Sequence, residues 1–381
     1  TNHERLKSWK AAQEGTAGIL LGTRSAVFSP IKDLGLIIVD EEHDNSLKQQ
    51  EGLRYSARDL AILRAKKEQI SIILGSATPS AESIFQCQNQ SYELIKLPKR
   101  AGKAVDPILK IIDLNKHGTR NGLSHPVIKA IAKTLKSGNQ ILVFLNRRGF
   151  APTLICQACN YIAECNRCDA RLTVHAKKNL LICHHCGSEH LIKKSCSKCG
   201  SLCKPLGHGT ERIEESLRLE FPSVKIKRID SDSIRLKGSM NEALLQATSG
   251  ETPILVGTQI LSKGHHFPKL SLVIIINADQ GLFNTDFRAP EKLAQSLIQV
   301  AGRAGREKKQ GTVMIQTQFS DHPFWKQLIN NKYDNFINNL LSERKKALWP
   351  PFSRIALIRT SSVNKCYSYD FLEDINKFIK N

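Results

Sequence analysis

Eight of the eleven cysteines form four doublets, each with two residues between its members. The doublets are Cys156/Cys159, Cys165/Cys168, Cys183/Cys186 and Cys196/Cys199. This spacing lets both thiolates of a doublet reach one tetrahedral zinc ion. Residues that tolerate the left-handed backbone of a tight metal-binding turn follow the doublets, namely Asn160, Asp169, Gly187 and Gly200. Eight thiolates fill two Cys₄ sites with no open position, so the sequence predicts two structural Zn²⁺ ions.

The doublets can be paired in three ways, and we favour the nested arrangement. Its inner site holds Cys165, Cys168, Cys183 and Cys186, because the loop between them then closes as a short hairpin. Its outer site holds Cys156, Cys159, Cys196 and Cys199. Four nearby residues could in principle replace a ligand, although we interpret them as neutral surface residues: His184, His185, His190 and Cys203.

A second group with chemical potential is Asp40-Glu41-Glu42-His43, directly after the apolar run Leu36–Val39. Nucleotide hydrolysis needs one carboxylate to hold Mg²⁺ and a second to position the attacking water. Asp40 fits the first role and Glu41 the second. Alone, the tetrapeptide could equally be an acidic strand end on a solvated surface. Ser76-Ala77-Thr78 follows another apolar run and should lie at the same sheet edge.

A third group lies at the end of a predicted helix, from Gln299 to Arg306. Its glycines, Gly302 and Gly305, allow close backbone packing, while Arg303 and Arg306 can project from the helix end. One of these arginines could stabilise the charge that develops on a transferring γ-phosphate. A plain basic helix end is the alternative, and the co-occurrence of all three groups favours phosphate chemistry.

The elements that must position these groups occur twice. Residues 19–43 run as apolar strand, Gly-Thr-Arg, loop and apolar strand with an acidic end, and residues 254–281 repeat that order. Short apolar runs alternate with amphipathic stretches such as 58–67 and 126–137, which indicates parallel strands buried under helices. The sequence therefore predicts an α/β protein with two lobes and a cleft at the carboxyl ends of the strands.

Composition shifts divide the chain into five predicted parts. The first lobe occupies 1–97, and a linker with the start of the second lobe occupies 98–155. The cysteine-rich insertion covers 156–205, the remainder of the second lobe covers 206–318, and a truncated C-terminal α+β domain follows at 319–381. The chain opens without methionine and ends within a helical pattern. We therefore expect it to be a piece of a longer protein.

The formal net charge of +21 indicates a polyanionic partner, with nucleic acid as the leading candidate. A solvated basic surface without a specific partner is the alternative. No apolar run reaches the roughly 18 residues of a membrane helix, and the N-terminus has no signal-peptide pattern. We expect no membrane partner and a soluble, intracellular protein.

The order of these motifs resembles superfamily 2 helicases, and specifically the replication-restart helicase family. The motifs are DEEH (40–43), GSATPS (75–80), FLNRRGF (144–150), the cysteine region, GTQILSKGHHFP (257–268) and QVAGRAGR (299–306). The resemblance implies two RecA-like lobes with a zinc-ribbon-like insertion in the second. It also implies an ATP-dependent 3′-to-5′ DNA helicase that recognises stalled forks and initiates primosome assembly. Primosome proteins and single-stranded DNA-binding protein are the implied protein partners. The implied location is the cytoplasm of a bacterium, in association with the nucleoid.

The same resemblance assigns roles to individual residues. ATP with Mg²⁺ would be held by Asp40, Glu41, Glu42, His43 and Gln299, while Arg303 and Arg306 would sense the γ-phosphate, with Arg306 as the finger. The expected contacts to the DNA backbone are Gly22, Thr23, Arg24, Tyr55, Gly257, Thr258, Gln259, Lys263 and Gly264. The nested zinc pairing also matches the family.

Two features depart from the family. The sequence holds no GxxxxGK[ST] phosphate loop, and the family's N-terminal DNA-binding domains have no counterpart, so these residues alone are expected to be inactive. In addition, Leu47 and Leu53 stand where the family carries aromatic residues, leaving Tyr55. A zinc-stapled DNA-binding or loading module without catalysis is the alternative function.

Overall fold

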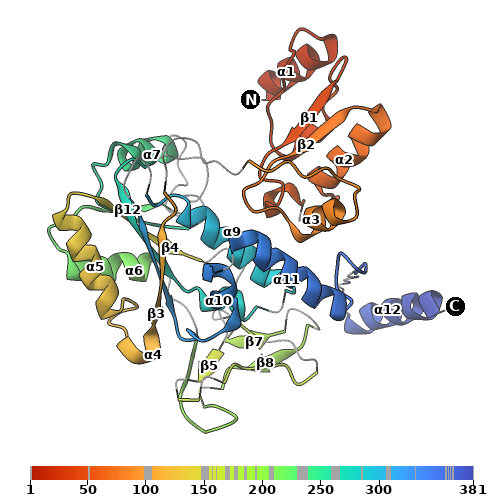
Figure 1. Ribbon diagram of the computed structural model, residues 1–381. Helices are drawn as coiled ribbons and strands as arrows, with labels where there is room; N and C mark the ends of the chain where they lie inside the picture. The colour runs from red at the N-terminus through yellow and green to blue at the C-terminus, as the bar shows by residue number, and fades with distance from the viewer. Residues whose placement is uncertain are drawn as a thin grey trace.

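The computed structural model describes residues 2–49, 52–97, 105–146, 154–156, 158–159, 161–167, 172–175, 179–183, 187–193, 195–205, 210–229, 239–258, 267–284, 286–305, 310–330, 332–356, 358, 360, 362 and 364–380. In Figure 1 the N-terminal part forms a small lobe, and a larger lobe follows. Helices α9 (Ala289–Ala301) and α11 (Lys332–Lys346) run along the side of the larger lobe that faces the smaller one. Two α/β lobes are therefore present, as the sequence predicts.

The small lobe contains a two-stranded parallel sheet, β1 (Leu36–Val39) paired with β2 (Ser71–Leu74). Along the chain, α2 (Ala57–Glu68) connects the two strands. It begins at its N-cap Ser56, whose side chain accepts a hydrogen bond from Asp59 N. The buried residues of α2 are three alanines spaced four apart: Ala57, Ala61 and Ala65. The remaining elements are α1 (Asn2–Glu14), η1 (Arg24–Phe28), η2 (Asn45–Leu47) and α3 (Ala81–Gln88).

The structure corrects two expectations about this lobe. Residues 19–21, predicted as a strand, form none, and Ile19 and Leu21 are 83% and 92% exposed. A strand requires a neighbour that accepts its backbone hydrogen bonds, and the described sheet here consists of β1 and β2 only. Nor is this sheet buried on both faces, because Ile38 and Ile73 are 63% and 52% exposed.

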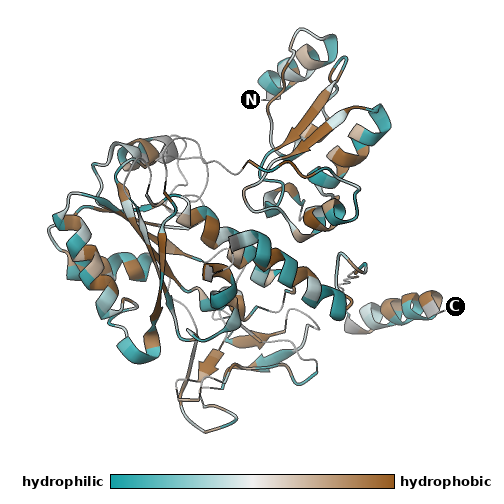
Figure 2. Ribbon diagram, in the orientation of Figure 1, coloured by the Kyte–Doolittle hydropathy of each residue, from teal (hydrophilic) through white to brown (hydrophobic). Residues whose placement is uncertain are grey.

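The large lobe is built on a six-stranded parallel sheet with the strand order β10-β11-β4-β12-β13-β3. Its strands are β3 (Ile108–Asp113), β4 (Gln140–Leu145), β10 (Ile226–Ile229), β11 (Ile254–Gly257), β12 (Leu270–Ile276) and β13 (Thr312–Thr317). All six residues of β4 are buried, since it lies inside the sheet with helices on both faces. Figure 2 shows these central strands in brown under helices that carry teal on their outer sides.

Alternate residues of the strands supply two separate cores. Ile141 and Val143 pack with α5 (His125–Lys136) and α6 (Thr210–Glu220) on one face. Leu142 and Phe144 pack on the other face, where the described helices are α7 (Ser239–Ser249), α9, α10 (Pro323–Asn330) and α11. This alternation follows from the two-residue repeat of a strand buried on both sides. The helices α4 (Leu114–His117), α8 (Asp279–Leu282) and α12 (Lys365–Lys380) complete the set.

Two predicted divisions do not coincide with divisions in the packing. Strand β3 lies within the composition shift interpreted as a connection, yet it forms the edge of the large sheet by pairing with β13. Beyond residue 319, Trp325 and Phe336 are buried in the same core cluster as Phe144. The charged and aromatic composition of these segments misled the prediction, because their apolar side chains complete the large lobe.

Between β4 and α6 lies a region of very short strands that we call the cysteine module, residues 154–205. It pairs β5 (Leu154–Cys156) with β9 (Cys203–Pro205), and it joins β6 (Thr173–His175), β7 (Leu180–Ile182) and β8 (Glu189–Leu191) in an antiparallel sheet. A small apolar joint of Ile155 and Ile162 with Phe283 attaches the module to the large lobe. Among the residues that the structure describes, no helix is both long and apolar enough to cross a membrane.

Candidate functional site

The acidic turn, residues 40–43, begins where β1 ends. Gly75 N donates to Val39 O at 2.8 Å and Glu42 N donates to Gly75 O at 3.1 Å, so the ends of β1 and β2 stay paired. Glu41 adopts a left-handed φ of 48°, and its amide donates to Asp40 Oδ1 at 2.9 Å. The turn therefore presents Asp40 and Glu41 at the carboxyl edge of the small sheet.

His43 connects this turn to the Ser-Ala-Thr segment after β2. Its Nδ1 lies 2.7 Å from Ser76 Oγ and 3.6 Å from Glu41 Oε2, and its Nε2 lies 3.5 Å from Thr78 Oγ1. The predicted meeting of the two motifs at one sheet edge is thus observed. The hydroxyl groups orient the imidazole ring against the Glu41 carboxylate.

Helix α9 brings a residue of the large lobe to the same place. Gln299 Nε2 lies 3.1 Å from Glu41 Oε2 and 3.0 Å from His43 Nε2. Arg303 follows one turn later, just beyond the end of α9, while Arg306 lies outside the described residues. Glu41, His43 and Gln299 therefore meet at one point between the lobes, and Asp40 precedes Glu41 in the turn.

Glu42, predicted to contact the nucleotide, has both carboxylate oxygens engaged by protein groups. Oε1 accepts from Ser80 N at 2.6 Å, and Oε2 accepts from Ser80 Oγ at 3.0 Å and from Arg58 at 3.1 Å. Burial opposes the charge on Arg58, but Asp59 and Glu42 outweigh it and raise the pKa of the guanidinium. Sequence reasoning missed Arg58 and Ser80, although Ser80 directly before a helical pattern has the signature of an N-cap.

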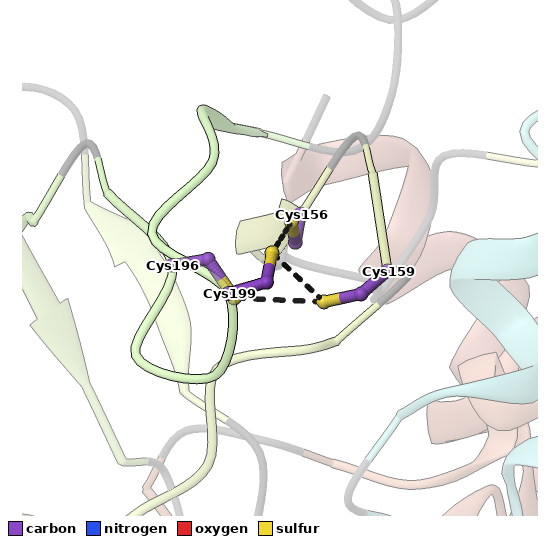
Figure 3. A group of neighbouring side chains, drawn as sticks. All are labelled: Cys156, Cys159, Cys196 and Cys199. Atoms are coloured by element: carbon purple, nitrogen blue, oxygen red, sulfur yellow. Dashed lines mark hydrogen bonds between the residues drawn. The ribbon is translucent and has the colours of Figure 1, made fainter.

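The outer cysteines form a compact cluster, shown in Figure 3. One ligand atom from each of Cys156, Cys159, Cys196 and Cys199 lies within 4.8 Å of all the others. The Sγ–Sγ separations include 3.4 Å between Cys156 and Cys199 and 3.6 Å between Cys159 and Cys196. Four sulfurs at about 2.3 Å around one zinc ion lie about 3.8 Å apart, so this donor set fits Zn²⁺.

Comparison with protein families gives two matches. Residues 165–190 match the PriA DNA helicase Cys-rich region domain, and residues 206–308 match the helicase conserved C-terminal domain. The replication restart protein PriA of Haemophilus influenzae is 46% identical over 381 residues, covering 100% of this chain and 52% of that protein. The Bacillus subtilis protein of the same name is 35% identical, covering 99% of this chain and 47% of its own length. The chain belongs to the PriA family.

The chain spans about half the length of the curated PriA relatives that it matches. Among solved structures, RecG bound to a three-way DNA junction aligns with a TM-score of 0.47 and 16% identity, covering 98% of this chain and 38% of that one. The PriA relatives and the two family matches confirm the family expected from the order of motifs. The α/β fold with two lobes and a cysteine cluster in the second is confirmed by the parallel sheets and by the family matches.

The outer cysteines of this PriA-family chain lie in tight turns. Gly200, with φ +74°, donates its amide to Cys196 O at 3.0 Å, in the backbone conformation that the sequence predicted after a doublet. Hydrogen bonds from the side chain and amide of Ser201 lower the pKa of the Cys199 thiol to about 6. Burial opposes ionisation of Cys196, but the amides of Cys199 and Lys198 lower the pKa of its thiol. The lowered pKa values of Cys196 and Cys199 favour the thiolate form, which is the form that binds metal.

The inner cysteines are described in part, because Cys168 and Cys186, with His184 and His185, lie outside the described residues. Cys165 and Cys183 are buried in one cluster, and Cys165 Sγ lies 3.0 Å from Ser188 Oγ and 4.0 Å from His190 Nε2. Cys203 was interpreted as a surface residue, but it is buried. Its pKa is raised to about 11, first by burial and then by Cys196 and Cys156.

The predicted DNA-contacting residues of the small lobe surround the loop after the acidic turn. Arg24 Nη1 donates to Ser46 O and to Lys48 O, both at 3.1 Å. Tyr55 packs edge-on against Phe28 with ring centroids 4.9 Å apart. A Cβ on Gly22 would lie 2.5 Å from Ala26 Cβ, so the chain leading to Thr23 requires glycine here. These contacts connect the Gly-Thr-Arg segment to the loop that follows the acidic turn.

In the large lobe, Gly257 ends β11 and Thr258 follows it, both buried. The other predicted DNA contacts of this lobe, Gln259, Lys263 and Gly264, lie outside the described residues. In the small lobe, Leu53 is 80% exposed, so the loop that departs from the family's aromatic pattern presents an aliphatic side chain to solvent.

Proposed function

We propose that this chain provides the motor lobes of an ATP-dependent 3′-to-5′ DNA helicase of replication restart. The whole protein would recognise stalled forks and initiate primosome assembly. The observation that carries this proposal is the contact of Gln299 with Glu41 across the two lobes. A hydrolysis site divided between two lobes can convert each turnover into a relative movement of the lobes, which translocation along one strand requires.

The residues divide the chemistry as follows. Asp40 would hold Mg²⁺, which would supply positive charge to neutralise the phosphates, and Glu41 would position the attacking water. His43 and Gln299 hold the Glu41 side chain from either side of the cleft. Arg303 and Arg306 stabilise the γ-phosphate, with Arg306 as the finger.

The DNA backbone would run along the Gly-Thr segments of both lobes, and of these segments the exposed one is Gly22-Thr23 of the small lobe. The contributing residues are Gly22, Thr23, Arg24, Tyr55, Gly257, Thr258, Gln259, Lys263 and Gly264. The formal net charge of +21 supports this partner. The cysteine module would hold two structural Zn²⁺ ions in the nested pairing and offer a surface to primosome proteins and single-stranded DNA-binding protein.

The decisive experiment is Glu41→Gln in the full-length protein. Without the carboxylate, we expect DNA-stimulated ATP hydrolysis to fall by about 10³-fold or more, while the affinity for forked DNA stays unchanged. Glu68→Gln is a matched control, because Glu68 pairs with Arg64 on α2 and lies outside the cleft. Retained hydrolysis in Glu41→Gln would remove the role given to Glu41.

Unwinding of duplexes with a 3′ or a 5′ single-stranded tail tests the direction of translocation.

A superfamily 2 helicase that acts on RNA is one rival, and it would be stimulated by RNA at least as strongly as by forked DNA. The rival function is a zinc-stapled DNA-binding or loading module without catalysis, which the basic charge and the cysteine doublets also permit. We expect the 381 residues alone not to hydrolyse ATP, and a full-length protein that binds forks without any hydrolysis would establish the rival.

A further inference from the structure

Helix α9 carries a stripe of three polar residues that contact the small lobe. Glu291, Gln295 and Gln299 are spaced four apart, so they share one face of the helix. Glu291 Oε1 accepts from Ala81 N at 2.8 Å, and Gln295 Nε2 donates to Thr78 O at 3.3 Å. Gln299 reaches the acidic turn, as described above. The stripe thus contacts the small lobe over about 12 Å of helix.

Glu291 is buried, and so is its partner. Glu291 and Arg344 of α11 are 4% and 1% exposed, and Arg344 Nη2 donates to Glu291 Oε2 at 2.6 Å. An unpaired buried carboxylate is strongly disfavoured, so Arg344 permits the charge to exist in this interior. The two helices therefore fix the direction of the carboxylate, and its other oxygen, Oε1, accepts from Ala81 N of the small lobe.

The group that Glu291 binds is itself tied to the acidic turn. Ser80 is the N-cap of α3 and Ala81 its first residue, so their amides are neighbours at the helix start. Ser80 N donates to Glu42 of the small lobe, while Ala81 N donates to Glu291 of the large lobe. One helix start thus joins a carboxylate from each lobe. Tyr333 reinforces this contact by donating to Pro79 O at 2.7 Å.

We propose that Glu291, held by Arg344, is a positioning residue that fixes the acidic turn relative to α9 through the start of α3. Glu291 contacts neither Asp40 nor Glu41. Instead it anchors one end of the α9 stripe, so that Gln299 at the other end meets Glu41 in a defined position. Ala81 lies in the core cluster of the large lobe, so a shift of this contact moves the acidic turn together with α3. This inference rests on the proposed function, because the group being positioned is the hydrolytic one.

Variants of the full-length protein break the contact from either side. Glu291→Gln removes the charge, and the double variant Glu291→Gln with Arg344→Met also removes the guanidinium that would otherwise remain unpaired. Ala81→Pro removes only the donor on the small lobe. Proline is tolerated as the first residue of a helix, and Ser80 has the extended backbone that proline requires before it (φ −66°, ψ 154°). Glu214→Gln on α6 is the matched control, since Glu214 pairs with Arg218 and Arg228.

The first readout is hydrogen exchange of the α3 amides of residues 82–88, which every variant retains. We expect exchange about tenfold faster in the double variant, where the hydrogen bond to the helix start loses its charge and its Arg344 support, and in Ala81→Pro, where the bond is lost. Exchange in β12 should stay unchanged, as it should everywhere in Glu214→Gln. Unchanged α3 exchange in both variants would overturn the contact itself.

The second readout is DNA-stimulated ATP hydrolysis. Loss of positioning without loss of a nucleotide contact should lower kcat about tenfold and leave the KM for ATP within about twofold. Faster α3 exchange with an unchanged kcat would overturn the positioning role. A wild-type protein that hydrolyses no ATP would overturn the proposed function instead, and the exchange readout would still decide whether Glu291 joins the lobes.

Discussion

The large lobe and the cysteine module lie side by side along the chain, yet different forces hold them together. Each of β4, β11 and β12 buries nearly its whole length, and the two faces of the sheet carry separate apolar cores. The strands of the module are three residues long. Five of the nine buried residues in its cluster are cysteines, so few apolar side chains remain to stabilise it. We infer that the large lobe is stabilised by burial of apolar side chains and the cysteine module by its metal-binding cysteines.

This difference explains how the module is attached. A region with little apolar core of its own can be stabilised by metal binding, and its metal site then provides its folding free energy. The joint of Ile155, Ile162 and Phe283 connects the module to an already stable lobe. Changes that affect metal ligands should therefore stay in the module, and changes in the apolar cores should stay in the lobe.

Metal removal should have the largest effect and should separate the two regions completely. Binding of one structural zinc contributes on the order of 10 kcal/mol to folding of its site, so chelation should unfold residues 156–205. Hydrogen exchange should show full loss of protection in β7 and β8 while β4 and β12 remain protected. Cys366→Ser serves as a control, because that thiol is exposed on α12, outside the cysteine module. Chelation that melts the large lobe as well would contradict the comparison.

Phe144→Ala should have the next largest effect, in the opposite region. Phe144 is fully buried in the sheet of the large lobe, and removal of such a side chain lowers the free energy of unfolding by about 3–5 kcal/mol. Chemical denaturation measures this loss, and metal analysis of the folded variant should give the wild-type zinc content. Phe378→Ala is the matched control, because Phe378 is 84% exposed on α12 and should change stability by less than about 0.5 kcal/mol. Zinc loss from folded Phe144→Ala would show that the two regions are not independent.

Apolar patterns predicted the large lobe well, because its strands are buried on both faces. The same reasoning failed at Ile19 and Leu21, since an apolar run forms a strand only where a partner strand lies beside it. It also placed a division near Phe319, because charged residues around Trp325 obscured the apolar face that completes the core. Local composition does not reveal which distant surface a segment covers.

Spacing predicted that the four outer cysteines would share one site, and the structure brings them together, because the ligand geometry of zinc restricts the loop between two cysteines. Motif order likewise brought Glu41, His43 and Gln299 into one prediction, and the structure brings them together. Glu291 and Arg344 were missed, because 53 residues separate them and neither follows a recognisable motif. Glu42 was assigned to the nucleotide from its neighbours, whereas its engagement with Ser80 depends on a loop 38 residues away.

The smallest effect is a pH dependence where the two regions meet. Asp279 is buried at the start of α8, and its carboxylate accepts hydrogen bonds from Thr317 Oγ1 and Gln318 N, next to Phe319 of the joint. Burial raises the pKa of Asp279 from 3.8 to about 6, although these hydrogen bonds oppose the rise. The folded state therefore holds its proton more tightly than the unfolded state, so the stabilisation is complete below pH 3.8 and is lost as the pH rises through 6. From pH 5 to pH 8, the wild type should lose about 1 kcal/mol of unfolding free energy relative to Asp279→Asn. Denaturation at the two pH values measures the difference. An equal change in unfolding free energy in both proteins would show that Asp279 titrates alike in the folded and unfolded states.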